Sequence, residues 1–237
     1  MTAQDPHSAV EPERHNASEL EKEFELERMI LFSDAVFAIA ITLMVIDIKW
    51  PDIPDSLKGV NLYQLFQPTI FQFIVFALSF FYIGRYWSQH LRLFRQLRTY
   101  NQGLINLNLL FLFFIVTFPF TASGVFGHIK TGFILPLILY SFNLAAVGVT
   151  HFLIVRYILR VKPGLSIHGE EAEKKYIYFR AKYTSTAMAL LFVLLVLVAI
   201  LSSGNPDYIG YTYLLIPFAL KYANKKANKY KPTTTAQ

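Results

Sequence analysis

One apolar run near the N-terminus combines a membrane-spanning length with polar side chains that could handle ions. The run from Met29 to Ile46 is close to the roughly 20 residues that a transmembrane helix needs. Ser33 and Asp34 interrupt it, and Arg28 stands at its start. A carboxylate in a membrane helix is unfavourable by roughly 2.5–3.5 kcal/mol, so it usually marks an ion path or a polar network. The alternative, an acid that reaches the headgroups, suits Asp34 poorly because its short side chain starts several residues inside the run.

Helical periodicity divides this run into two faces. Ile39, Thr42, Leu43 and Ile46 fall within one stripe about 100° wide, whereas Asp34 lies about 140° away from Ile39. If the aliphatic stripe lines a path, Asp34 points into surrounding protein. The reverse assignment puts Asp34 on the path and the aliphatic stripe in the core. Periodicity leaves both assignments open.

The charged groups of the run need partners on other helices. Arg28 and Asp34 are separated by about 120° and about 9 Å of helical rise, so they should not pair directly. Trp87 and His90, near the end of the second apolar segment, are the expected partners of Asp34 or its neighbours. Together these residues predict a polar clamp between two helices, with His90 as a hydrogen-bonding residue and not a metal ligand.

Composition indicates an all-α polytopic membrane protein with six transmembrane helices. Hydrophobic residues make up 54% of the chain, charged residues 16%, and the mean hydropathy is +0.38. Several apolar runs follow the first one, which argues against a cleaved signal peptide. We expect spans at about 29–48, 68–88, 103–126, 132–155, 183–203 and 207–221.

Basic residues are distributed unevenly between the connections. Fifteen lie after the second, fourth and sixth expected spans, and three lie in the alternate connections. The fifteen are Arg92, Arg95, Arg98, Arg156, Arg160, Lys162, Lys174, Lys175, Arg180, Lys182, Lys221, Lys225, Lys226, Lys229 and Lys231, and the three are Lys49, Lys58 and Lys130. This asymmetry predicts cytoplasmic termini in the cell's inner (plasma) membrane, and it assigns the basic patches to the inner leaflet and not to nucleic acid.

Three regions are expected along the chain. Residues 1–27 hold eight acids and two bases, which predicts an acidic cytoplasmic tail, partly disordered, with a short helix near residues 20–26. Residues 28–222 form the six-helix transmembrane domain. Residues 223–237 form a basic cytoplasmic tail.

Several function classes lack their characteristic residues. The chain has no cysteine, no His-Glu-x-x-His pair and no glycine-rich phosphate loop, so we expect no enzyme, no cofactor and no resident metal. A Thr-Val-Gly-Tyr-Gly potassium filter is also missing, and the nearest string, residues 123–127, lacks the tyrosine. A proton-coupled transporter would need several acids at mid-membrane, and Asp34 is the single candidate.

The pattern Arg28-x-x-x-Phe32-Ser33-Asp34, followed by an aliphatic run through Leu43, resembles the first helix of the transmembrane protein 175 potassium channels. The resemblance is to the single-repeat prokaryotic form, and it implies a homotetramer with a pore lined by the first helix of each subunit. It makes Ile39 the hydrophobic constriction. The resemblance further implies a pore lined by Ile39, Thr42, Leu43 and Ile46, and a structural polar network of Arg28, Phe32, Ser33, Asp34, Trp87 and His90.

The expected function is therefore passive conduction through a potassium-permeable cation channel that has a side-chain constriction and no carbonyl filter. The expected partners are the lipid bilayer, three further copies of the chain and permeant K⁺. Asp47, near the outer end of the first span, would attract cations to the outer mouth. The alternative function is a proton-coupled secondary transporter, or a proton-conducting channel, that uses Asp34.

Overall fold

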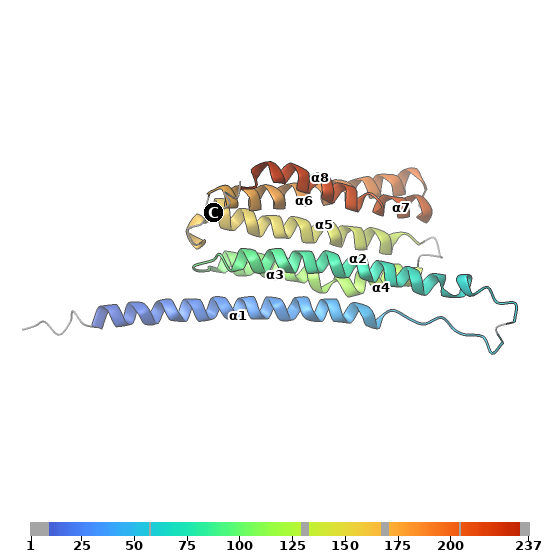
Figure 1. Ribbon diagram of the computed structural model, residues 1–237, viewed down its shortest axis with the longest axis horizontal. Helices are drawn as coiled ribbons and strands as arrows, with labels where there is room; N and C mark the ends of the chain where they lie inside the picture. The colour runs from blue at the N-terminus through green and yellow to red at the C-terminus, as the bar shows by residue number, and fades with distance from the viewer. Residues whose placement is uncertain (1–9, 57, 129–132, 167–170, 204, 233–237) are drawn as a thin grey trace, which may run out of the picture.

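The computed structural model describes residues 10–56, 58–128, 133–166, 171–203 and 205–232 (Figure 1). Its elements are α1 (Val10–Ile46), α2 (Leu62–Phe94), α3 (Gln102–Val116), α4 (Phe118–His128), α5 (Leu135–Arg156), the π-helical turn η1 (Tyr157–Val161), the 3-10 turn η2 (Pro163–Leu165), α6 (Glu171–Leu201), α7 (Pro206–Tyr213), α8 (Ile216–Ala227) and the 3-10 turn η3 (Asn228–Tyr230). The predicted all-helical class is confirmed.

The helices lie side by side in one elongated bundle (Figure 1). α1 runs along one edge and packs against α2, α3 and α4, while α5 lies between this group and α6. α7 and α8 cover α6 at the opposite edge. In the described part of the chain, five helical segments are long and apolar enough to cross a membrane: 21–46, 62–94, 102–126, 135–161 and 171–201. The protein is therefore a multi-pass membrane protein.

Asparagine caps start the second and third segments. The Asn61 side chain accepts hydrogen bonds from the first-turn amides of α2, and the Asn101 side chain accepts one from Leu104 at 2.9 Å. These bonds satisfy amides that have no partner inside the helix, which fixes where each helix begins. Because Asn101 ends the short connection after α2, the cap also sets α3 beside α2.

The third expected span is a helix interrupted once. α3 ends at Val116 and α4 begins at Phe118, where Pro119 has no amide to donate to the carbonyl of Ile115. The Thr117 hydroxyl lies at this break and donates to the Asn143 side chain on α5 at 3.0 Å. This hydrogen bond to α5 fixes the position of the break between α3 and α4 within the bundle.

The sixth expected span, 207–221, was wrong as a single helix. It is divided into α7 and α8 at Leu214 and Leu215, whose amides bond to carbonyls three residues back at 3.2 and 3.1 Å. Pro217 explains the division, because it cannot donate to the carbonyl of Tyr213 and its ring crowds the preceding turn.

The predicted boundary between residues 27 and 28 is not a helix end, because α1 is continuous from Val10. Residues 11–27 are rich in Glu, Leu, Ala, Lys and Arg, which are strong helix formers and so extend the membrane helix into the tail. This extension is also docked: Leu26 is buried, and Glu25 accepts a hydrogen bond from the Tyr100 hydroxyl. At the other end, α8 continues through the predicted boundary after residue 222, with Ala223 and Ala227 buried.

Candidate ion pathway

α1 presents one face to the bundle and the opposite face to the outside. The buried face consists of Leu26, Ser33, Phe37, Ala40 and Met44. These positions recur at intervals of three, four and seven, so they form one stripe along the helix. The stripe contacts α2, α3 and α4, and it anchors α1 along much of the span.

The aliphatic stripe of α1 is exposed in the single chain. Ile39 is 56% exposed, Leu43 45% and Ile46 70%, and Thr42 is exposed beside them. Ile39 lies about 160° around the helix from Phe37, which is buried. The aliphatic stripe is therefore not part of the core of this subunit, and it is free to face a partner subunit, lipid or an ion path.

A buried chain of hydrogen bonds joins α1, α2 and α3. His90 Nε2 and Asn108 Oδ1 are 2.8 Å apart, and Asn108 Nδ2 donates to Ser33 Oγ at 3.0 Å. Ser33 Oγ in turn donates to the carbonyl of Met29 at 2.8 Å. Each of the three polar side chains is at most 1% exposed. A helix that rotated or slid would leave these groups without partners in an apolar interior, so the bonds fix the register of α1.

Aromatic rings enclose this chain of hydrogen bonds. The imidazole of His90 stacks on Phe94 with ring centroids 3.9 Å apart and on Phe111 at 5.7 Å. Phe37 lies 5.8 Å from the same imidazole and 5.8 Å from Phe111. The rings exclude water from the His90 and Asn108 bond, which makes a missing partner there more costly.

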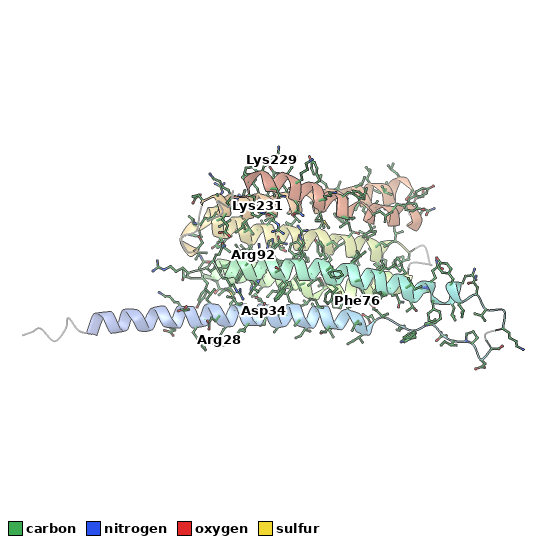
Figure 2. The ribbon with its side chains drawn as sticks, viewed as in Figure 1. Arg28, Asp34, Phe76, Arg92, Lys229 and Lys231 are labelled. Atoms are coloured by element: carbon green, nitrogen blue, oxygen red, sulfur yellow. The ribbon has the colours of Figure 1, made fainter. Side chains whose placement is uncertain are left out.

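Asp34 makes a separate contact with α2. Trp87 Nε1 donates to Asp34 Oδ1 at 2.8 Å, and both side chains are partly exposed. Figure 2 shows Asp34 on α1 where that helix faces the rest of the bundle. The Asp34 carboxylate thus points toward α2 and away from the Ile39 stripe.

The other residues predicted for the polar network are arranged differently. His90 bonds to Asn108 and not to Asp34. Arg28 and Phe32 lie on exposed positions of α1, and among the described residues no hydrogen bond joins Arg28 to Asp34. The structure therefore places Ser33 and His90 in one set of hydrogen bonds, which runs through Asn108. Asp34 and Trp87 form a separate hydrogen bond.

Asn108 is the residue that the sequence analysis missed. It is buried in the middle of α3, a mostly apolar helix, and it bridges His90 and Ser33. An asparagine facing inward in a membrane helix needs an interhelical partner, so its position in the run 102–116 was the available signal.

The opposite end of α1 is held through the following loop. Asp47 comes directly after Ile46 and is partly buried. The amide of Lys49 donates to Gln72 Oε1 at 3.0 Å, and the Thr69 hydroxyl donates to the carbonyl of Lys49 at 2.9 Å. These bonds tie the loop to α2, so Asp47 is anchored on both sides.

Cationic side chains gather at one end of the bundle. In Figure 2 Arg28, Arg92, Lys229 and Lys231 lie in one half of the molecule, and Phe76 lies in the other. The half that holds the basic residues is also the half in which Asp34 meets Trp87. The Ile39 stripe continues from this half toward the opposite end, where Asp47 is located.

Residues 28–119 match the family model described as endosomal/lysosomal potassium channel TMEM175. The matched stretch is less than half of the chain. It contains the Phe32-Ser33-Asp34 motif, the aliphatic stripe and Asn108, so the resemblance drawn from the first helix is confirmed.

Two relatives match different shares of the chain. A potassium channel of Chryseobacterium is 27% identical over 150 residues, which is 63% of this chain and 73% of that protein. The human endosomal/lysosomal proton channel TMEM175 is 27% identical over 157 residues, 65% of this chain but only 30% of the human protein. Both relatives are named as ion channels, which agrees with the expectation that the chain is not an enzyme.

A solved TMEM175 structure shares the fold. The crystal structure of a lysosomal potassium-selective channel TMEM175 homologue from Chamaesiphon minutus superposes with a TM-score of 0.64. The match covers 84% of this chain and 98% of that chain, at 21% sequence identity. The likeness extends well beyond residues 28–119, so most of the helical bundle has the fold of that structure.

Proposed function

We propose that the protein is a potassium-permeable cation channel of the plasma membrane, built from four copies with α1 of each copy around a central pore. The observation that carries the proposal is the exposed aliphatic stripe of Ile39, Thr42, Leu43 and Ile46 on a helix whose opposite face is anchored in the bundle. The bacterial relative's name, a potassium channel, supports the same function.

The narrowest point of the proposed pore is a ring of four Ile39 side chains. Such a hydrophobic ring gates by excluding water, because an ion cannot cross it without losing part of its hydration shell. Leu43 and Ile46 extend the apolar wall toward the outer end. Thr42 supplies the hydroxyl beside the constriction. Its Oγ1 donates to the carbonyls of Ala38 and Ile39 at 3.0 and 3.1 Å, which leaves oxygen lone pairs to face an ion.

Selectivity in this channel comes from side chains. The sequence has no Thr-Val-Gly-Tyr-Gly filter, and α1 is helical throughout the stripe, so its carbonyls are engaged along the helix axis. Carbonyl rings of the kind found in potassium filters need an extended backbone facing the pore. Four Thr42 oxygens next to a hydrophobic ring are the remaining candidates for preferring K⁺ over Na⁺.

The basic end of the bundle faces the cytoplasm in our proposal. The fifteen cationic side chains there follow the positive-inside rule, and both described ends of the chain lie toward it (Figure 1). Asp47 then belongs to the outer mouth of the pore.

Tetramer assembly through α1 can be tested with single cysteines, because the chain has none of its own. We expect Ile46→Cys to form covalent dimers with a short bifunctional thiol reagent, since neighbouring copies meet at the pore. Leu190→Cys is the matched control, because Leu190 is 64% exposed but lies on α6. Native mass spectrometry of the uncrosslinked protein should give the mass of four chains. A monomer, or crosslinking through Leu190→Cys alone, would overturn the assembly.

Channel activity itself is tested by recording from the purified protein in planar bilayers. We expect unitary current steps and a reversal potential that follows the K⁺ gradient. A reversal potential that follows an imposed proton gradient would instead favour the proton-conducting alternative through Asp34. Steady flux without unitary steps would favour a transporter.

Asp47 should raise the local cation concentration at the outer mouth. We expect Asp47→Asn to lower the single-channel conductance at low salt and to leave it unchanged near 1 M salt, where the Debye length falls to about 3 Å. Glu21→Gln removes the same charge from an exposed position in the N-terminal part of α1 and is the matched control. An unchanged low-salt conductance for Asp47→Asn would remove this residue from the pathway.

A further inference from the structure

A cavity with several charged side chains on its wall lies at the basic end of the bundle, away from the α1 stripe. Its volume is about 200 Å³, and it is bounded by α2, α5, α6 and the segment after η3. A single water molecule occupies about 30 Å³ in the liquid, so the cavity has room for a polyatomic group with some water. None of its lining residues belongs to α1, which makes it a separate feature from the proposed pore.

Positive charge dominates the cavity wall. Arg92 comes from the last turn of α2, Arg180 from α6 and Lys231 from the segment after η3. Figure 2 shows Arg92 and Lys231 in the same half of the molecule. Glu173 supplies the single carboxylate on this wall, and its Oε1 already accepts a bond from Gln96 Nε2 at 3.4 Å. Three cations thus converge on one space that holds one acid.

Two nitrogens at this cavity have no hydrogen-bond partner among the described residues. His151, which is 3% exposed and lines the cavity, has no hydrogen-bond partner for Nε2. The Nε of Arg180 is also buried without a partner. Buried polar groups are normally satisfied, so these two nitrogens leave hydrogen-bonding capacity for a bound group, and the Arg180 Nε–H needs an acceptor oxygen.

We propose that this cavity binds a phosphate-bearing anion. Guanidinium groups bind phosphate through pairs of parallel hydrogen bonds, and an ammonium adds a point charge. Arg92 and Arg180 supply the guanidiniums, Lys231 supplies the ammonium, and the imidazole of His151 can complete the set. Because the cavity lies at the basic end, its phosphate can come from an anionic lipid of the inner leaflet or from a soluble cytoplasmic anion.

Binding is measured on the full chain in a zwitterionic detergent. The probes are inorganic pyrophosphate, dioleoyl phosphatidylglycerol and dioleoyl phosphatidylcholine, each titrated at constant ionic strength while the midpoint of thermal unfolding is followed. Stabilisation by pyrophosphate identifies a soluble anion, and stabilisation by phosphatidylglycerol but not by pyrophosphate identifies a lipid headgroup. Native mass spectrometry counts the bound molecules per chain.

Substitutions then place the site. We expect Arg92→Gln and Arg180→Gln each to weaken binding by about tenfold to a hundredfold, the loss expected for one charge-assisted hydrogen bond. Glu173→Gln should strengthen binding, because it removes the opposing carboxylate and keeps an acceptor for Gln96. Arg95→Gln and Lys182→Gln are the matched controls, since they remove exposed charges outside the cavity, the first directly after α2 and the second from α6.

Glu173→Gln tests the site even if an arginine variant folds poorly, because the proposal predicts stronger anion binding for this variant and not weaker binding. Equal weakening by the cavity and control substitutions would mean a general attraction to the basic surface and would overturn the site. Stabilisation by none of the three probes, or by phosphatidylcholine as much as by phosphatidylglycerol, would also overturn it.

Discussion

Ile39→Asn should give a folded tetramer that carries a larger and less selective cation current than the parent. A ring of polar side chains at the proposed constriction would hold water where isoleucine excludes it, and an ion would then keep more of its hydration shell. Lowering the barrier by about 1.4 kcal/mol raises the current about tenfold, and we expect an increase of this order. Single-channel conductance and the reversal potential between K⁺ and Na⁺ measure the two effects.

Val45→Asn is the matched control for Ile39→Asn. Val45 is 50% exposed on the same helix but lies about 120° around it from Ile39. If α1 lines the pore through the Ile39 stripe, Val45→Asn should leave conductance and selectivity unchanged. An Ile39→Asn protein that conducts no better than the parent, or a Val45→Asn protein that conducts equally well, would remove the pore from this face of α1.

The sequence could predict which residues share a face of α1, but it could not decide which face is buried. Both faces of this helix are largely apolar, so burial energy alone distinguishes them weakly. The choice is made by long-range contacts: Phe37 fits among the rings of His90 and Phe111, and Ser33 meets Asn108 from 75 residues away. Periodicity is a local property and carries no information about such partners.

Hydropathy located the spans well because the bilayer sets a minimum apolar length. Helix ends were less predictable, for local reasons. α1 extends back to Val10 because the acidic tail is also rich in helix formers, and charge by itself does not end a helix. The sixth span breaks before Pro217, a cue that was visible in the sequence but that membrane helices often tolerate.

Of the two polar contacts that α1 makes inside the bundle, the sequence predicts the one at Asp34 but not the one at Ser33. Trp87 was expected to reach Asp34, and its indole nitrogen lies 2.8 Å from that carboxylate. Asn108 was not expected, because its two partners lie on two other helices and only the fold brings them together. The Asn108 side-chain amide fills both roles, because its Nδ2 donates to Ser33 while its Oδ1 accepts from His90.

Asn108→Leu should be the most destabilising substitution in this network. Leucine has the same number of side-chain heavy atoms but no polar atoms, so Ser33 loses a donor and His90 loses its Nε2 partner inside a ring of phenylalanines. Leaving a buried polar group unsatisfied costs about 1–3 kcal/mol, and here two groups are affected. We expect a lower midpoint of thermal unfolding in detergent and a lower yield of tetramer.

Asn106→Leu provides the comparison, because Asn106 is exposed on the same helix and should tolerate the change. Asp34→Ala is expected to fall between the two, since it leaves Trp87 without an acceptor at a partly exposed position, and Asp34→Asn should restore most of the loss by keeping that acceptor. Equal stability of the Asn108 and Asn106 variants would show that the buried chain does not hold α1. An Asp34→Asn protein that assembles normally but loses ion selectivity would move Asp34 from a structural contact onto the ion path, and with it the face of α1 that lines the pore.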